Sequence, residues 1–269
     1  AISSRKKPAC WYSIFAELYR VMLRKRIIPI VLLDGFSVLK TINFNQRRNL
    51  GSPITVARTY NTRNVDELVL LDIDATKQKR SIDKFTIAEV AKECFMPLTV
   101  GGGIKTVKEI QGLLAKGADK IAINSYALEN PAFIKEASDM FGSQCIVVSI
   151  DVVEDNDNFY IYNQGEIDKN FQLFDWIKTA ESLGAGELLI NNVSRDGLME
   201  GGSVQLAELV SNNVSIPVIY AGGVSSPDNA ALVGKTAVSG VGISSIFHFT
   251  DTTPEDCRNA FKSHDIPAR

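Results

Sequence analysis

The chain has 269 residues, of which 45% are hydrophobic and 22% charged. This composition is typical of one compact globular domain and excludes a disordered or fibrous protein. The formal net charge of -2 gives no basic field for nucleic acid or anionic lipid, and no apolar stretch reaches the ~18 residues of a bilayer span. We therefore expect no nucleic-acid partner and no membrane partner, and an anionic ligand has to be held by local groups.

The cysteine and histidine content limits which cellular compartment and which cofactors fit this protein. The 4 cysteines, at positions 10, 94, 145 and 257, form neither a C-x-x-C pair nor a paired framework, which fits free thiols in a reducing cytosol. His248 and His264 are the only histidines, too few for a histidine-rich metal site or relay. We expect a cytoplasmic protein with no metal and no other cofactor.

The first segment does not look like a targeting signal. A basic cluster, Arg5 to Lys7, precedes a mixed run that Glu17 interrupts, whereas a signal peptide needs a cleaner apolar centre. We interpret residues 1–21 as an upstream extension or a cloning remnant, with a short amphipathic helix as the alternative. Residues 22–269 then form a single domain.

From Arg26 onward, short β-branched runs alternate with longer segments of helical period, as in parallel strands covered by helices. The expected strands are Ile27–Leu33, Glu67–Ile73, Pro97–Val100, Lys120–Asn124, Cys145–Asp151, Glu187–Asn191, Pro217–Ala221 and Val238–Ile243. Eight such strands predict an α/β fold, a closed (β/α)8 TIM barrel, and an open doubly wound sheet is the alternative.

The sequence also repeats itself at long range. The glycine-rich segment 101–104 resembles segment 221–224, and segment 123–125 resembles 243–245, both at an offset of about 120 positions. A shared offset is what two fused half-barrels of four βα units would leave. It therefore favours a closed barrel made of two halves.

Both repeated loops follow strands, where a barrel carries its chemistry. Glycines without a Cβ let backbone N–H groups wrap a phosphate, and Asn124-Ser125 and Ser244-Ser245 would add side-chain donors. Two copies on opposite halves predict two phosphate sites. The alternative is that the glycines only close tight βα turns.

Asp151 ends the fifth strand, and a carboxylate at that depth should have a raised pKa useful for proton transfer. It is the leading acid/base candidate, with a helix cap or a ribose-binding carboxylate as alternatives. We expect Asp72, Asp74 and Asp196 to orient loops.

Six motifs, in order, tie the chain to a known family. They are LTVGGGI at 98–104, GADKIAIN at 117–124, FGSQ at 141–144, GAGE at 184–187, RDG at 195–197 and IFHF at 246–249. In them the chain closely resembles the cyclase subunit of imidazole glycerol phosphate synthase, from Leu23 to the C-terminus. The resemblance implies a barrel that forms a heterodimer with a glutaminase subunit and receives its ammonia. The family joins that ammonia to a bisphosphorylated ribulose substrate, giving imidazole glycerol phosphate and an aminoimidazole ribotide.

The resemblance also assigns site residues. It makes Asp151 one of two catalytic aspartates, and matches Lys40 to a lysine of the family's active-site loop. It assigns one phosphate to Gly103, Asn124 and Ser125, and the other to Asp196, Gly197, Gly223, Ser244 and Ser245. Asn191 stands where the family usually has Thr.

The family's other catalytic aspartate ends strand one, where the alignment places Leu32. The internal repeat agrees, because Leu32 lies 119 positions before Asp151. Asp34 would restore a carboxylate only if the strand slipped by two residues. Since removal of an acid or base costs roughly 10²-fold or more, Leu32 argues against an efficient cyclase. The chain resembles most the family's divergent branch found with surface-polysaccharide genes, where ammonia serves the conversion of an acetamido into an acetamidino group.

Four expected strands begin with a charged residue whose signs cancel: Arg26, Glu67, Lys120 and Glu187. Strand starts define the amino-terminal mouth, so these side chains can form a neutral ring of two salt bridges across the barrel floor. The family resemblance matches all four to a ring that gates ammonia entry. The alternative is a plug that serves stability alone.

Three functions remain open. The first is a synthase subunit of a glutamine amidotransferase, which takes ammonia from a glutaminase at its amino-terminal face and supports amidation of a phosphorylated sugar or nucleotide sugar. The second is a true cyclase of histidine biosynthesis. The third is a non-catalytic partner that activates a glutaminase and conducts ammonia, and the sequence does not separate it from the first.

Overall fold

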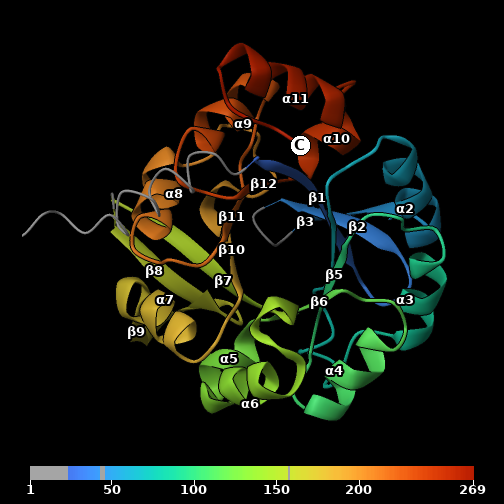
Figure 1. The fold of residues 1–269 in the computed structure, drawn as a ribbon, viewed down its shortest axis with the longest axis vertical. Helices are drawn as coiled ribbons and strands as arrows, with labels where there is room; N and C mark the ends of the chain where they lie inside the picture. Colours follow the sequence, from blue (N-terminus) through green and yellow to red (C-terminus); the bar gives the residue numbers. More distant parts are fainter. Residues whose placement is uncertain (1–23, 43–45, 157) are drawn as a thin grey trace, which may run out of the picture.

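The structure, a computed structural model, describes residues 24–42, 46–156 and 158–269. Eight parallel strands close into a barrel, because the last strand pairs with the first (Figure 1). They are β1 (Arg26–Leu33), β4 (Leu68–Asp72), β5 (Leu98–Gly101), β6 (Lys120–Ile123), β7 (Ile146–Asp155), β10 (Glu187–Asn192), β11 (Val218–Ala221) and β12 (Gly240–Ile243). The predicted TIM barrel is confirmed, and the β1–β12 pairing excludes the open sheet. The expected extension over residues 1–21, with Cys10, lies outside the described residues.

Helices surround the barrel on all sides (Figure 1). The outer layer consists of α2 (Pro53–Thr62), α3 (Lys84–Ala91), α4 (Val107–Leu114), α6 (Ala132–Phe141), α7 (Leu173–Ser182), α8 (Val204–Ser211), α9 (Pro227–Gly234) and α11 (Pro254–Ser263). The chain starts several of them with a side-chain cap, as where Thr106 and Glu109 form a capping box at α4. Of the helices in the described ranges, none is both long and apolar enough to cross a bilayer.

The core has two layers, because successive strand residues face opposite sides. One face of each strand packs against the helices, and the other fills the barrel. The barrel filling is aliphatic and includes Ile28, Ile30 and Leu32 of β1 together with Val69, Val147 and Leu189. Continuous burial along β1 is the reason that its apolar run shows no alternation.

Two antiparallel hairpins, absent from the sequence prediction, extend the sheet. β2 (Val38–Ile42) and β3 (Gln46–Gly51) follow β1, while β8 (Asn158–Asn163) and β9 (Glu166–Gln172) follow β7. In each case the first hairpin strand pairs with the barrel strand that precedes it. Each half of the barrel therefore begins with a strand and its hairpin.

The loops after the strands repeat in the same way. Asn124 precedes the short helix α5 (Ser125–Glu129) with φ -121° and ψ -98°, and Ser244 precedes α10 (Ser245–Phe249) with φ -134° and ψ -72°. Two short 3-10 turns, η1 (Ser143–Cys145) and η2 (Val193–Arg195), complete the described elements. The two halves thus share backbone geometry where they share sequence.

Candidate active site and barrel floor

A pocket opens at the carboxyl ends of the strands. Residues from both halves line it, namely Leu32, Lys40, Arg47, Asp72, Gly103, Asn124, Ser125, Asp151, Asn191, Asp196, Gly223, Ser244 and Ser245. The structure therefore brings Asp151 together with most of the predicted phosphate residues. Gly197 follows Asp196 in the same loop, with φ 78°.

The two loop glycines are fixed by conformation and by space. Gly103 has φ 63° and Gly223 has φ 82°, in the region that favours glycine. A Cβ on Gly103 would lie 1.9 Å from the Arg80 carbonyl oxygen, and one on Gly223 would lie 2.7 Å from that of Gly201. The tight-turn explanation accounts for both glycines by itself, so phosphate binding stays a prediction here.

Ser244 gives that prediction independent support. Its Oγ is buried without a hydrogen-bond partner, although the residue lines the pocket. A buried hydroxyl without a partner is costly unless a ligand or water satisfies it. Ser244 is therefore the predicted phosphate residue that most needs a ligand.

Asp151 is held by two amide groups. Asn124 Nδ2 donates to Asp151 Oδ2 at 2.8 Å, and Asn191 Nδ2 donates to Oδ1 at 3.2 Å. Burial raises the pKa of Asp151 to about 6, although these two hydrogen bonds oppose the shift. The side chain of Asn124, predicted as a phosphate ligand, thus serves Asp151, and Asn191 has a positioning role that the sequence did not indicate.

Leu32 occupies in the first half the place of Asp151 in the second. Leu32 pairs with Leu71 of β4, as Asp151 pairs with Asn191 of β10. Leu32 faces the barrel interior and lines the pocket. Asp34 is exposed in the turn after β1, where its Oδ1 accepts from the Ser37 N–H, so β1 has not slipped to bring this carboxylate into the pocket.

Lys40 and Asp196 form a buried ion pair instead of acting separately. Lys40 Nζ lies 2.9 Å from Asp196 Oδ1, and the Thr41 hydroxyl donates to Oδ2 at 2.9 Å. Both carboxylate oxygens of Asp196 are thereby engaged. A phosphate predicted here would therefore contact the backbone of the loop and not the Asp196 side chain. Lys40, expected on a loop, lies on strand β2 because the hairpin pairs with β1.

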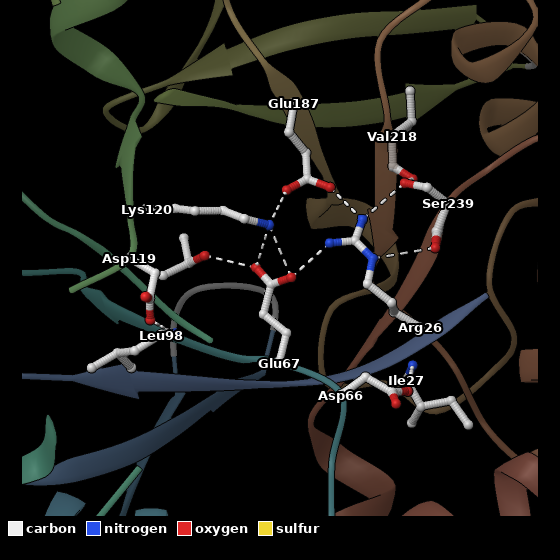
Figure 2. Close-up of polar contacts among 11 residues, drawn as sticks. Arg26, Ile27, Asp66, Glu67, Leu98, Asp119, Lys120, Glu187, Val218 and Ser239 are labelled. Carbon is white, nitrogen blue, oxygen red and sulfur yellow. Dashed lines mark hydrogen bonds and ion pairs between the residues drawn. The ribbon is translucent and has the colours of Figure 1, made fainter. Parts of the chain in front are cut away.

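The floor of the barrel carries the predicted charged ring (Figure 2). Arg26 contacts both Glu67, at 2.6 Å, and Glu187. Lys120 contacts the same two carboxylates, at 3.0 and 2.7 Å. The expected two salt bridges are therefore a closed ring of four contacts.

Neighbouring groups complete the ring's hydrogen bonds. The Thr99 hydroxyl donates to Glu67 at 2.7 Å. Arg26 donates to the Ser239 hydroxyl at 3.0 Å (Figure 2). Although burial alone would raise the pKa of Glu187, Arg26 and Lys120 together hold it below its usual value. The ring thus combines two cationic with two acidic side chains. Val69 and Leu189, two residues further along the strands from Glu67 and Glu187, belong to the apolar filling of the barrel, and Leu189 also lines the pocket.

Within the part of the chain that the structure describes, no three His, Cys, Asp or Glu side chains are grouped in a way that could hold a metal ion. Cys94, Cys145 and Cys257 are free thiols. Burial raises the pKa of Cys94 to about 11, so this thiol is not an activated nucleophile. The chemistry of the pocket therefore centres on Asp151, its amide partners and the loop donors.

Comparison with known proteins shows the family of the chain. The family described as "Histidine biosynthesis protein" matches residues 26–253. "Putative imidazole glycerol phosphate synthase subunit hisF2" of Campylobacter jejuni is 46% identical over 251 residues, 92% of this chain and 99% of that protein. "Imidazole glycerol phosphate synthase subunit HisF" is 41% identical in Staphylococcus saprophyticus and 39% in Exiguobacterium, each over 92% of this chain and at least 97% of the relative. The chain therefore belongs to the histidine biosynthesis protein family, among its HisF-like imidazole glycerol phosphate synthase cyclase subunits.

Proposed function

We propose that the chain is the synthase subunit of a glutamine amidotransferase. It takes ammonia from a glutaminase partner docked at the amino-terminal face of the barrel and supports amidation of a phosphorylated sugar derivative, from acetamido to acetamidino, in surface-polysaccharide synthesis. The observation that carries the proposal is the pairing of a closed charged floor with a pocket that has one carboxylate free of a cation.

The pocket supports a reaction other than the family's cyclisation. Three carboxylates line it, but Asp72 is held by Arg80 and Asp196 by Lys40. Only Asp151, among the described lining residues, is left for proton transfer. With Leu32 at the matching place in the other half, a reaction that needs both an acid and a base lacks one of them.

The floor supports ammonia entry from a partner. Buried ion pairs seldom stabilise a protein more than apolar packing of the same volume, because desolvation of the charges offsets their attraction. A ring of four contacts at the barrel axis therefore needs another reason. Passage of a small polar molecule into the apolar interior supplies one, and a bound glutaminase would keep that molecule out of bulk water.

The test uses the chain together with a glutaminase from its native cell. Lys120→Met should make ammonia leak or stall, so that glutamine is consumed with less aminated product, while external ammonium restores the product. The matched control is Lys135→Met, which removes an exposed pair with Asp139 on α6. Tight coupling in Lys120→Met, or no association with any glutaminase, would leave the ring as a structural plug.

The second candidate is a true cyclase of histidine biosynthesis, favoured by the relatives named HisF at 39–41% identity. We expect the unmodified chain, given ammonium and the ribulosyl aminoimidazole carboxamide bisphosphate, to form little imidazole glycerol phosphate, and Leu32→Asp to form more. Turnover by the unmodified chain at the rate of an ordinary cyclase would establish this candidate instead.

A third candidate is a conduit without catalysis of its own. Asp151→Asn separates it from the first, because a pure conduit has no use for proton transfer at that carboxylate. Unchanged sugar amidation by Asp151→Asn in the reconstituted system would favour the conduit.

A further inference from the structure

The hairpin β2–β3 is attached to two opposite sides of the pocket rim. Lys40 of β2 is paired with Asp196 in the loop after β10. Arg47 of β3 is paired with Asp74 in the loop after β4, through two contacts of 2.5 and 2.6 Å. Both cations line the pocket, whereas Asp74 does not. The hairpin therefore brings one cation toward each half of the barrel.

Arg47 lies on the side of the Gly103 loop. Its partner Asp74 belongs to the segment between β4 and α3, which packs directly on that loop: a Cβ on Gly103 would lie 3.1 Å from the Ala75 Cβ. The Gly102 carbonyl also accepts from the Ile82 N–H at 2.9 Å. The Arg47 guanidinium and the Gly103 loop are thus parts of one wall of the pocket.

A ligand can compete with Asp74 for Arg47, because the Arg47 end of this ion pair is solvated. The Arg47 side chain is 39% exposed and can take a new partner at the pocket, whereas the Asp74 side chain is only 12% exposed. A phosphate carries more charge than a carboxylate and accepts two parallel hydrogen bonds from a guanidinium. A phosphate can therefore replace Asp74 on Arg47, and the buried Asp74 carboxylate then has only the nearby charges of Lys77 and Arg80 to offset its own.

We propose that Arg47 is an anion-binding residue of the pocket, which moves from Asp74 to a phosphate held at the Gly103 loop and so selects ligands phosphorylated at that end. The inference rests on the phosphorylated ligand of the proposed function and adds to it a residue that selects the ligand. Asp74 then acts as a competitor for Arg47 in the free protein.

Because Asp74 and a phosphate compete for Arg47, substitutions of Arg47 and of Asp74 should change ligand affinity in opposite directions. Binding of ribulose 1,5-bisphosphate, a probe with a phosphate at each end, is measured by titration calorimetry for the unmodified chain, Arg47→Gln and Asp74→Asn. We expect Arg47→Gln to weaken binding about tenfold and Asp74→Asn to tighten it severalfold, because Arg47 is released. Arg58→Gln is the matched control, since Arg58 of α2 forms an exposed pair with Glu93 in the turn after α3. Thermal unfolding of Arg47→Gln and Asp74→Asn tests whether both variants remain folded.

The outcomes separate this inference from the proposed function. If Arg47 only pins the hairpin, both variants weaken binding in the same direction, and the inference is overturned. It is also overturned if the unmodified chain binds the probe and Arg47→Gln binds it equally well, although the phosphate pocket then stands. No binding by the unmodified chain removes the phosphate pocket as well, whereas the coupling of glutamine hydrolysis to amination would still decide the role of the floor.

Discussion

At the scale of single residues, Asp151 is a carboxylate whose charge the fold disfavours. Its pKa of about 6, against 3.8 for an ordinary aspartate, means that the native state takes up a proton on folding between about pH 4 and pH 6. The stability that this proton uptake contributes is present below about pH 4 and lost as pH rises through about 6. Above that pH, the ionised carboxylate destabilises the native state by on the order of 2–3 kcal/mol.

Asp151→Asn should therefore be more stable than the unmodified chain at pH 8, by about 1–2 kcal/mol, and should gain nothing at pH 4. The gain is smaller than the full penalty because the new amide cannot accept from both Asn124 and Asn191. Urea unfolding at the two pH values is the measurement. A gain of equal size at both pH values would show that the charge of Asp151 is not its cause.

Gly103 offers a test of crowding at the phosphate loop. Gly103→Ala should lower the free energy of unfolding by about 3 kcal/mol or more, because its Cβ would meet the Arg80 carbonyl oxygen. Gly51→Ala is the control, since Gly51 also has positive φ, 102°, but no atom lies within 4 Å of its added Cβ. Both variants carry a conformational cost, and the φ of Gly51 lies further from the left-handed region open to L residues, so a lower urea midpoint for Gly103→Ala reports the collision. Equal midpoints would mean that the loop relaxes around the methyl group.

The site was predictable where position along a strand decides it. The four ring residues lie at strand starts or just before them. Asp151 does not end its strand as expected, because the hairpin with β8 extends β7 to Asp155, but it lies near the carboxyl end of the part of β7 that pairs in the barrel. The alternation of a strand fixes which way such residues face. The side-chain partners were not predictable. Asn124 donates a hydrogen bond to Asp151, and Asp196 pairs with Lys40, because the barrel brings together segments that are far apart in sequence.

At the scale of elements, the hairpin β2–β3 acts on Asp151 through Asp196. The charge of Asp196 raises the pKa of Asp151, and Lys40 neutralises that charge. Lys40→Met should therefore move the pKa of Asp151 above 6, as followed by carboxyl NMR, while Lys135→Met leaves it unchanged. A downward shift would mean that Asp196 leaves the pocket once Lys40 is removed.

The barrel strands followed from the sequence and the hairpins did not. β1 and β7 are β-branched and buried on both faces, which gives them a strong signal over at least five residues. β3, with the sequence QRRNLG, and β9, with EIDKNFQ, are polar edge strands. These strands form because a neighbouring barrel strand or its hairpin partner pairs with them. A local sequence pattern does not indicate such pairing.

At the scale of the molecule, the floor ring joins β1, β6 and β10 with the residue that precedes β4. Lys120→Met leaves two carboxylates with one cation and should lower the free energy of unfolding by about 3 kcal/mol. Lys120→Met combined with Glu187→Gln restores neutrality through Arg26 and Glu67. In urea unfolding, the double variant should therefore lower the free energy of unfolding by less than the two single variants do in sum. Additive losses would show that the four side chains do not act as one unit.

The β1–β12 pairing has a consequence for synthesis on the ribosome. The edge of β1 stays without its partner until residues 240–243 have been made, so this apolar strand waits while more than two hundred residues are translated. The edge of β6 waits only for β7, the next strand along the chain. Nascent chains that stall before residue 240 would expose the β1 edge, and a chaperone that binds extended apolar segments would find its site there.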